Sequence, residues 1–287
     1  MISRPLVDFE AAVELLDQHD AREVVREGHF GHAQAQIRPR LDRRGEPEGA
    51  ADDEAELRLS GVLPRADELR HALARHLLSL HAEGDHVRIR RDGQIDGVNG
   101  IHDPEAFTTV FEETDDTVTG NRVLPEGLVS PDVVTLDKKT WRKALGDDDF
   151  LLALHIPGGE GYTPERVKSS CEKALAFYDR YYPEYHYIGF WSESWLYDPG
   201  LREIVKPERN IVRVQRQFYC YPVEEGDRMI KLEVLGDENA DYRKLTPRNS
   251  LECGMFEVWG RGDRFHTTGM FLLREEVPRI GENPYET

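Results

Sequence analysis

Three glycines within four residues, Gly158, Gly159 and Gly161, form the stretch with the clearest chemical implication. They follow a short apolar run and precede Thr163, a residue suited to cap a helix. Glycines let backbone N–H groups approach an anion closely, and the positive end of a helix dipole attracts it. We therefore predict that these four residues bind a pyrophosphate. The alternative is a tight strand-to-helix turn that needs positive φ, and Glu160 adds a negative charge to the loop.

Two residues near this loop are predicted as catalytic bases. His155 stands at the end of the strand before the loop, and an imidazole titrates near neutral pH. Glu193 lies in a later predicted strand among aromatic residues, where a raised pKa would let its carboxylate deprotonate an amine. The structural alternatives are a histidine that is hydrogen-bonded to backbone at a sheet end, and a glutamate paired with Arg213 or Arg216.

Three further residues are predicted to bind a substrate. If 210–223 forms a strand, alternation puts Arg213 and Gln215 on one face, where the arginine could hold a carboxylate or phosphate. Alternation likewise places Trp195 beside Glu193, in a region rich in tyrosine and tryptophan that could line a cleft. The alternatives are a solvent-exposed strand face for the polar pair and a hydrophobic core for the aromatic residues.

Composition limits the partners of this chain. Its 287 residues include 37 basic and 55 acidic side chains, a net charge of −18 that repels nucleic acids and anionic membranes. The three widely spaced cysteines predict neither a disulfide framework nor a zinc site, and the histidine spacings predict no metal site. The N-terminal residues lack a signal-peptide core and no segment approaches the ~20 apolar residues of a membrane span, so we expect a cytoplasmic protein.

The elements expected in the N-terminal region, 1–147, are mixed. Apolar spacing predicts helices over 5–27 and 65–82, and the charged, Gly- and Pro-containing segment 38–56 predicts an exposed linker. Asp92 and Gly93 predict the turn of a hairpin. The remaining expectations are a short helix over 104–114, a strand over 129–137 and a helical turn over 138–145.

The C-terminal half, 148–287, has sharper signals. Strands are expected over 150–156 and 187–196, with a helix between them that is capped by Thr163, begins at Pro164 and continues to about Tyr182. The pattern further predicts a short helix near 199–205, strands over 210–223, 229–236 and 269–277, and a helix over 250–256. Strands that alternate with helices indicate an α/β or α+β fold with a mixed sheet flanked by helices.

Four segments of this half resemble a bacterial family of GNAT-like acyltransferases. These are LHIPGGEGYTPERV, SWLYDP, NIVRVQRQF and NSLECGMFEVWGRGDRFHTTGMFLL, and the resemblance covers 154–273. It implies a GNAT-like C-terminal domain and a nucleotide-thioester cofactor. The chain departs from the pattern at Ile156, where GNAT enzymes have Gln or Arg before the glycines, and at Glu193, where the family usually has histidine.

The resulting hypothesis is an N- or O-acyltransferase that uses acetyl-CoA or another acyl-coenzyme A and acts on an unknown small molecule. Direct attack by the acceptor is expected, because no nucleophile triad is visible. A non-catalytic GNAT-like binding module is the alternative, so whether the chain is an enzyme stays open. A third possibility is a hydrolase that uses Glu193 and Asp198 as paired carboxylates.

Overall fold

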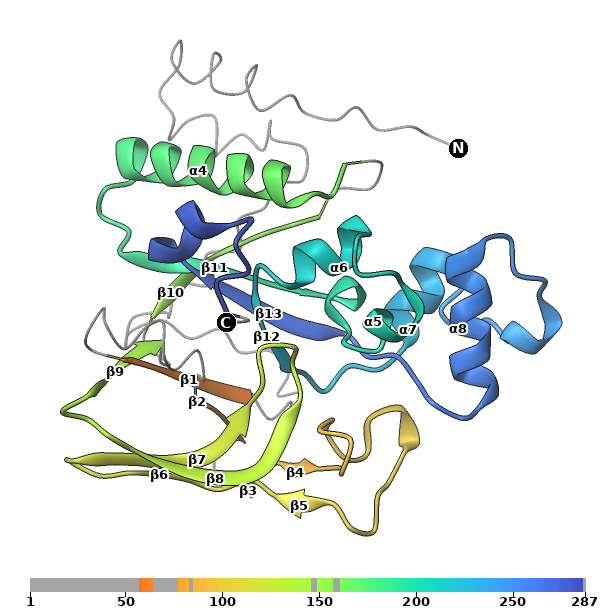
Figure 1. Ribbon diagram of the computed structural model, residues 1–287, viewed down its shortest axis with the longest axis horizontal. Coiled ribbons are helices and arrows are strands. Elements are labelled where there is room, and N and C mark those ends of the chain that lie inside the picture. Colours follow the sequence, from red (N-terminus) through yellow and green to blue (C-terminus); the bar gives the residue numbers. More distant parts are fainter. Residues whose placement is uncertain (1–56, 65–76, 83–84, 146–148, 157–160, 286–287) are drawn as a thin grey trace, which may run out of the picture.

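The computed structural model describes residues 57–64, 77–82, 85–145, 149–156 and 161–285, and for the stretches before residue 87 it describes the backbone alone. Figure 1 shows three layers: helix α4 (Pro164–Tyr181), a central sheet, and a set of N-terminal strands on the other side of that sheet. The predicted helix over 5–27 and the predicted linker over 38–56 lie outside the described residues.

The central sheet has the strand order β10-β11-β13-β12. Its strands are β10 (Phe150–Ala153), β11 (Tyr187–Ser194), β12 (Tyr219–Pro222) and β13 (Thr268–Leu273). β10 and β11 run parallel, as expected for two strands joined by a helix, whereas β13 is antiparallel to both of its neighbours. The predicted fold class, a mixed sheet flanked by helices, is confirmed.

Helix α4 begins where the sequence predicts. The Thr163 side chain accepts a hydrogen bond from the backbone N–H of Arg166 at 3.3 Å, and Pro164 occupies the first turn. Val167 and Cys171 on its inner face are buried in one hydrophobic cluster with Leu152 of β10. The helix is therefore held on the sheet by its apolar stripe.

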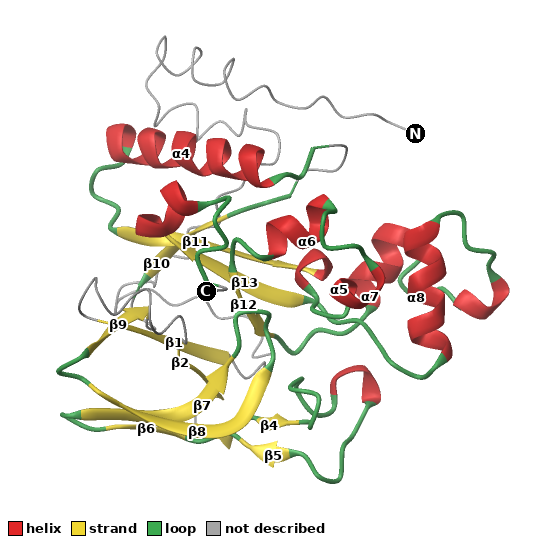
Figure 2. Ribbon diagram, in the orientation of Figure 1, coloured by secondary structure: helices red, strands yellow, loops and turns green. Residues whose placement is uncertain are grey.

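The N-terminal strands form three small sheets (Figure 2). One has the order β3-β2-β1-β9, built from β1 (Leu57–Pro64), β2 (Leu77–Ala82), β3 (Asp85–His86) and β9 (Trp141–Leu145). The second, β6-β7-β8, contains β6 (Phe111–Glu113), β7 (Thr117–Val123) and β8 (Val129–Asp137). The third pairs β4 (Arg88–Ile89) with β5 (Phe107–Thr108).

Some N-terminal expectations are confirmed and others are wrong. Gly93 has a φ of 86° in the predicted hairpin turn, and β8 is the predicted strand over 129–137. The helices expected over 104–114 and 138–145 are wrong, because these segments supply β5, β6 and β9. Residues 77–82 are likewise strand β2 and not the end of a helix. Strand β9 is stabilised by the distant strand β1, and β2, β5 and β6 by strands nearer in the chain, and local periodicity reveals none of these pairings.

The predicted C-terminal strands over 210–223 and 229–236 are largely helical, and only Tyr219–Pro222 of the first is a strand, β12. Segment 210–215 is helix α6 (Asn210–Gln215), because Ile211, Val214, Gln215 and Phe218 repeat at helical spacing although β-branched residues are frequent there. Segment 228–235 consists of α7 (Arg228–Ile230) and a π-helical turn, with Ile230 buried in a second hydrophobic cluster. The other helices are α5 (Leu201–Ile204) and α8 (Ser250–Gly260).

The largest hydrophobic cluster crosses the boundary at 147 that the sequence suggests. Val87, Ile89 and Val123 from the N-terminal strands share it with Phe271 of β13. The hydroxyl of Tyr219, on β12, also donates to the Val123 carbonyl. The N-terminal strands and the C-terminal sheet are therefore packed together, and the division into two domains stays a prediction.

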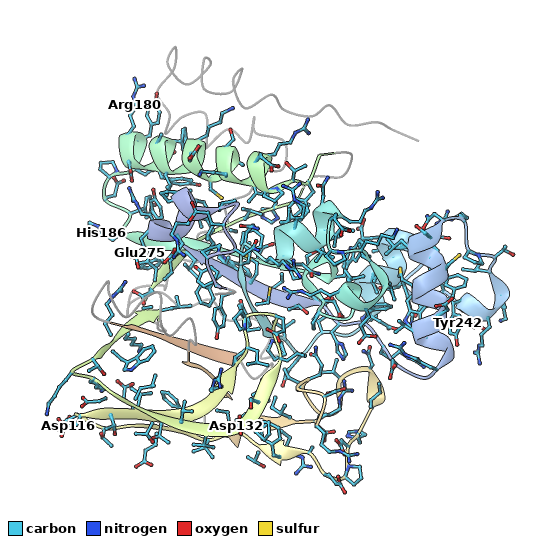
Figure 3. All side chains as sticks on the ribbon, viewed as in Figure 1. Asp116, Asp132, Arg180, His186, Tyr242 and Glu275 are labelled. Atoms are coloured by element: carbon cyan, nitrogen blue, oxygen red, sulfur yellow. The ribbon has the colours of Figure 1, made fainter. Side chains whose placement is uncertain are left out.

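The described surface is strongly charged. Figure 3 shows Asp116 and Asp132 on the outer side of the N-terminal strands and Arg180 on the outer side of α4. No helix in the described part of the chain is long and apolar enough to cross a bilayer. Within the same residues, no group of three or more His, Cys, Asp or Glu side chains is arranged to hold a metal ion.

Candidate functional site

The parallel pair β10–β11 stops before β11 ends. Its pairing runs to Ala153 opposite Trp191, and the backbone N–H of Leu154 then donates to the Trp191 carbonyl at 2.8 Å. β11 continues for three more residues, and Ser194 still pairs with Thr268 of β13. Among the described residues, this last part of β11 has a ladder partner on its β13 side alone. The chain that follows β10 therefore leaves β11 at Trp191, two residues before Glu193, and continues toward α4.

The described part of the glycine loop reaches the start of α4 in a conformation that needs glycine. Gly161 has a φ of 118°, and a Cβ there would lie 1.8 Å from Nη1 of Arg166. The Arg166 guanidinium therefore lies directly against the loop backbone. Gly158 and Gly159 fall outside the described residues, so their predicted contact with a cofactor stays a prediction.

The carboxylate of Glu165 provides a negative charge at the start of α4. Hydrogen bonds from its own backbone N–H, from the Thr163 hydroxyl and from Arg213 lower the pKa of Glu165 to about 2. The Arg213 Nη2 to Glu165 Oε1 distance is 2.7 Å. Donors from two helices thus converge on one carboxylate, which shows that this helix start stabilises negative charge.

Family comparison identifies the type of domain. The sequence profile described as "GNAT-like C-terminal domain" matches residues 99–271, more than half of the chain. The chain belongs to this GNAT-like family. The match begins among the N-terminal strands and extends well before the segments 154–273 that carry the sequence resemblance.

Structural comparison gives partial matches to solved acyltransferase complexes. One, with decanoyl-CoA and teicoplanin, is 28% identical over 43% of this chain and 40% of its own, with a TM-score of 0.40. Another, with decanoyl-CoA, is 20% identical over 57% of this chain and 46% of its own, with a TM-score of 0.39. The chain therefore spans less than half the length of these acyltransferases. Comparison with curated protein sequences gives no match.

In this GNAT-like protein, the predicted catalytic residues His155 and Glu193 lie at strand ends, and the predicted substrate residue Trp195 lies in a separate turn. His155 is exposed at the end of β10, and Glu193 is exposed near the end of β11. Trp195 does not share a strand face with Glu193, because the chain leaves the sheet at Ser194 and enters a 3-10 turn, Trp195–Tyr197. The Trp195 ring is partly buried and packs against the second hydrophobic cluster.

Helix α6 places Arg213 and Gln215 on different sides. Gln215 is fully buried, and its amide donates to the carbonyls of Leu196 at 2.7 Å and Asp198 at 3.0 Å. Its Oε1 accepts from Arg202 at 3.0 Å. Arg213 is partly exposed and faces Glu165, so it is the member of the pair that adjoins the start of α4. The shared face expected from strand alternation is wrong, whereas a substrate role for either residue stays a prediction.

Sequence analysis overlooked two neighbours of the loop. Arg166 follows the cap by three residues, and this spacing could have placed it over Gly161. Tyr162 turns its ring into the core and forms a 2.9 Å hydroxyl pair with Tyr197, which also hydrogen-bonds to Ser192. Burial raises the pKa of both tyrosines, so both phenols are neutral and anchor the loop to the sheet.

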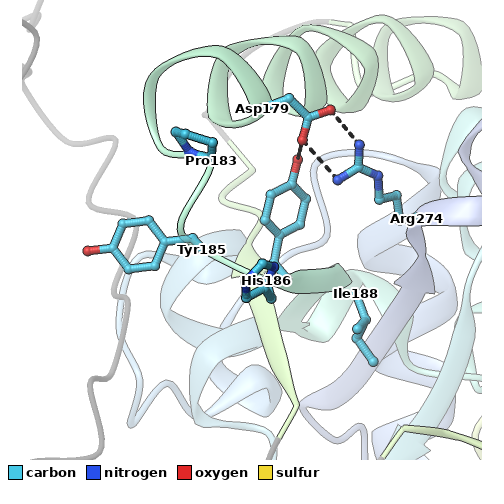
Figure 4. A pocket seen from close by; sticks show the side chains of 7 residues that line it. Asp179, Pro183, Tyr185, His186, Ile188 and Arg274 are labelled. Atoms are coloured by element: carbon cyan, nitrogen blue, oxygen red, sulfur yellow. Dashed lines mark hydrogen bonds and ion pairs between the residues drawn. The ribbon is translucent and has the colours of Figure 1, made fainter.

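A shallow surface depression lies at the other end of β11 (Figure 4). Its volume is about 360 Å³, and its lining residues are Asp179, Pro183, Tyr185, His186, Tyr187, Ile188 and Arg274. Asp179 binds Arg274 through both carboxylate oxygens and also accepts from the Tyr187 hydroxyl at 3.0 Å. The charged groups of this depression therefore satisfy one another.

Proposed function

We propose that this GNAT-like chain binds an acyl-coenzyme A at the start of α4 and transfers the acyl group to a nucleophile of a small molecule. The observation that carries the proposal is the parting of β10 from β11 at Trp191, next to a helix start whose donors already converge on an anion. Family membership gives this geometry its chemical interpretation.

The residues at the helix start fit a pyrophosphate. Gly161 keeps its backbone open at positive φ, and a side chain there would displace the Arg166 guanidinium. Arg166, in the first turn of α4, lies against Gly161, and Arg213 of α6 contacts Glu165 in the same turn. The two arginines would supply the positive charge that Ile156 does not. The net charge of −18 makes such a local positive site necessary for any anionic ligand.

A bound acyl-coenzyme A supplies a thioester, an acyl carbon that is activated for attack. Glu193, exposed where β11 has parted from β10, would take a proton from the attacking group of the acceptor. The new bond forms to the acyl carbon, the carbon–sulfur bond breaks, and the thiol leaves with a proton. The chain's contribution is to hold both reactants in line and to accept the proton.

Calorimetric titration of the full chain with coenzyme A and acetyl-coenzyme A tests the proposal. We expect saturable binding, and about 2.7 kcal/mol of added stability at 100 times the dissociation constant. Glu165→Gln should tighten binding by about three- to tenfold, because the internal carboxylate then no longer competes for Arg213. Glu172→Gln removes the same charge from an exposed position further along α4 and should leave affinity unchanged.

A non-catalytic binding module is the second candidate, and the Glu165–Arg213 ion pair favours it. In that case the helix start is satisfied permanently by the protein's own carboxylate. Absence of binding at millimolar coenzyme A, both in the unmodified protein and in Glu165→Gln, would reject the acyltransferase proposal in favour of the module.

A further inference from the structure

One side chain of the N-terminal region holds two loops of the C-terminal half. It belongs to residues 97–101, here called the strap, in the connection between β4 and β5 that lies below the C-terminal helices in Figure 1. The Asn99 amide donates to the Phe265 carbonyl at 2.9 Å and accepts from the Asp227 backbone N–H at 2.9 Å. The strap is therefore joined to loops 223–227 and 261–267.

The base of the strap is fixed to the N-terminal strands. The Asp96 backbone N–H donates to the Arg88 carbonyl at 2.9 Å, and the Asp96 carboxylate accepts from the Asp103 N–H at 2.8 Å. The Gly97 N–H then donates to the Ile101 carbonyl at 2.8 Å, which closes the strap on itself. Any movement is therefore confined to the residues beyond Asp96.

The backbone of the strap suits a movable segment. Gly97, Asn99 and Gly100 have positive φ, at 95°, 59° and 70°. Glycine adopts either sign of φ at little cost and asparagine tolerates the left-handed region, so these positions can change conformation readily. Each of the five residues is at least partly exposed, and Val98 packs only from a partly buried position against the main hydrophobic cluster.

The two loops form a fixed seat for the Asn99 amide. A Cβ on Gly226 would lie 2.0 Å from the Asn99 Oδ1 atom and 2.8 Å from its Cγ atom, so the amide fits only because residue 226 has no side chain. Phe265 is fully buried in the second hydrophobic cluster, and Asp227 is also buried. A strap with little buried surface thus meets rigid loops through two hydrogen bonds, each of modest net strength.

The seat lies at the end of the sheet that carries Glu193. Loop 223–227 follows Pro222, loop 261–267 precedes Thr268, and these two strand residues pair with each other. Thr268 also pairs with Ser194, the residue after Glu193. The strap therefore borders the part of β11 that extends beyond its separation from β10.

We propose that the strap opens and closes over these two loops, with Asn99 as its latch, and forms a movable boundary beside the end of β11. The structure shows the closed form. Opening breaks the two Asn99 hydrogen bonds, lets water replace them, and leaves Asp96 and the seat in place. The movement uses no group at the start of α4, so it is independent of the proposed acyl transfer.

Hydrogen exchange measured by NMR on the unmodified full chain gives the first test. The Asp227 amide and the strap amides of Gly97 and Gly100 should exchange with one common opening free energy, because a single event releases all three. Separate values, or protection equal to that of Leu272 in the core strand β13, would show that the strap does not open as a unit.

A reversible cross-link tests the movement directly. The short distance between Asn99 and a Cβ at residue 226 suits a disulfide between Asn99→Cys and Gly226→Cys, and Cys253→Ser removes the exposed native thiol. We expect oxidation to slow exchange of the strap amides by about tenfold relative to the reduced protein. Equal exchange in both forms, or failure of the cross-link to form in the folded protein, would overturn the proposal.

Two matched asparagines provide a test without a cross-link. Asn99 and Asn283 are the non-glycine residues with positive φ in the part of the chain that the structure describes, so glycine fits both backbones. Asn99→Gly should speed exchange of the strap amides about tenfold, whereas Asn283→Gly, which removes a contact with Gln217, should leave them unchanged. Unchanged strap exchange in Asn99→Gly would reject the latch. No ligand is added, so these outcomes are separate from those of the coenzyme A titration.

Discussion

An arginine–carboxylate pair lies at each end of helix α4, and the two pairs differ in geometry and in the groups around them. At its far end, Asp179 binds Arg274 through two oxygens and also accepts from the Tyr187 hydroxyl, while the Arg274 guanidinium stacks 5.1 Å from the Tyr187 ring centre. At its start, Glu165 Oε1 lies 2.7 Å from Arg213 Nη2. The far pair joins the helix to the end of β13, and the near pair joins two helices.

This difference shows which end of the helix can exchange a partner. The far pair combines bidentate geometry, a phenol and a ring, so its loss would leave several groups unsatisfied. The near pair is monodentate and lies where backbone donors attract any anion, so a phosphate could replace the carboxylate of Glu165 with little cost. We therefore interpret the depression beside Asp179 as a structural corner and propose the start of α4 as the exchangeable site.

The largest expected effect concerns the helix that carries Arg213. Gln215→Met keeps the volume but removes the amide, so the carbonyl of Leu196 loses this donor, that of Asp198 keeps only the Leu201 N–H, and Arg202 Nε loses this acceptor. We expect the free energy of unfolding in urea to fall by about 2–4 kcal/mol. A loss below about 0.5 kcal/mol, combined with lost coenzyme A binding, would instead restore a ligand-binding role for Gln215.

The features predicted correctly are those that local residues determine. Thr163, Pro164 and Glu165 identify the start of α4 without tertiary information, and Gly161 is required there by its positive φ. Strand β9 was missed because it exists through pairing with β1, about 80 residues earlier. Helix α6 was missed because three β-branched residues in six suggested a strand.

The candidate site divides in the same way. Thr163 and Gly161 lie together at the helix start, since neighbours in sequence must be neighbours in space. The contact of Arg213 with Glu165 was missed because it joins residues 48 positions apart, through the packing of α6 against α4. No spacing rule along the chain encodes that arrangement.

An intermediate effect separates the two arginines. Arg274→Ala removes the bidentate pair and the ring contact, and we expect the free energy of unfolding to fall by about 1 kcal/mol, discounted for the partial exposure of both partners. Arg213→Ala should leave the urea midpoint unchanged and weaken coenzyme A binding. Urea unfolding and coenzyme A titration are measured on both variants, so that each variant is the control for the other. Equal stability losses, or weaker binding in Arg274→Ala alone, would show that the ends of α4 have been assigned the wrong way round.

The smallest expected effect is the pH dependence of the far pair. Hydrogen bonding to Arg274, and then to Tyr187, lowers the pKa of Asp179 below its ordinary 3.8. A carboxylate whose pKa is depressed on folding contributes stability that is present above its unfolded pKa and is lost as the pH falls through its folded pKa. The stability difference between the unmodified protein and Arg274→Ala should therefore be constant above about pH 5 and shrink below pH 4, where Asp179 becomes protonated.

Lys206→Ala, which removes an exposed positive charge before α6, should show no such convergence in the same urea titrations. A difference that persists unchanged to pH 3 would mean that the Arg274 contribution comes from its contact with the Tyr187 ring and not from Asp179.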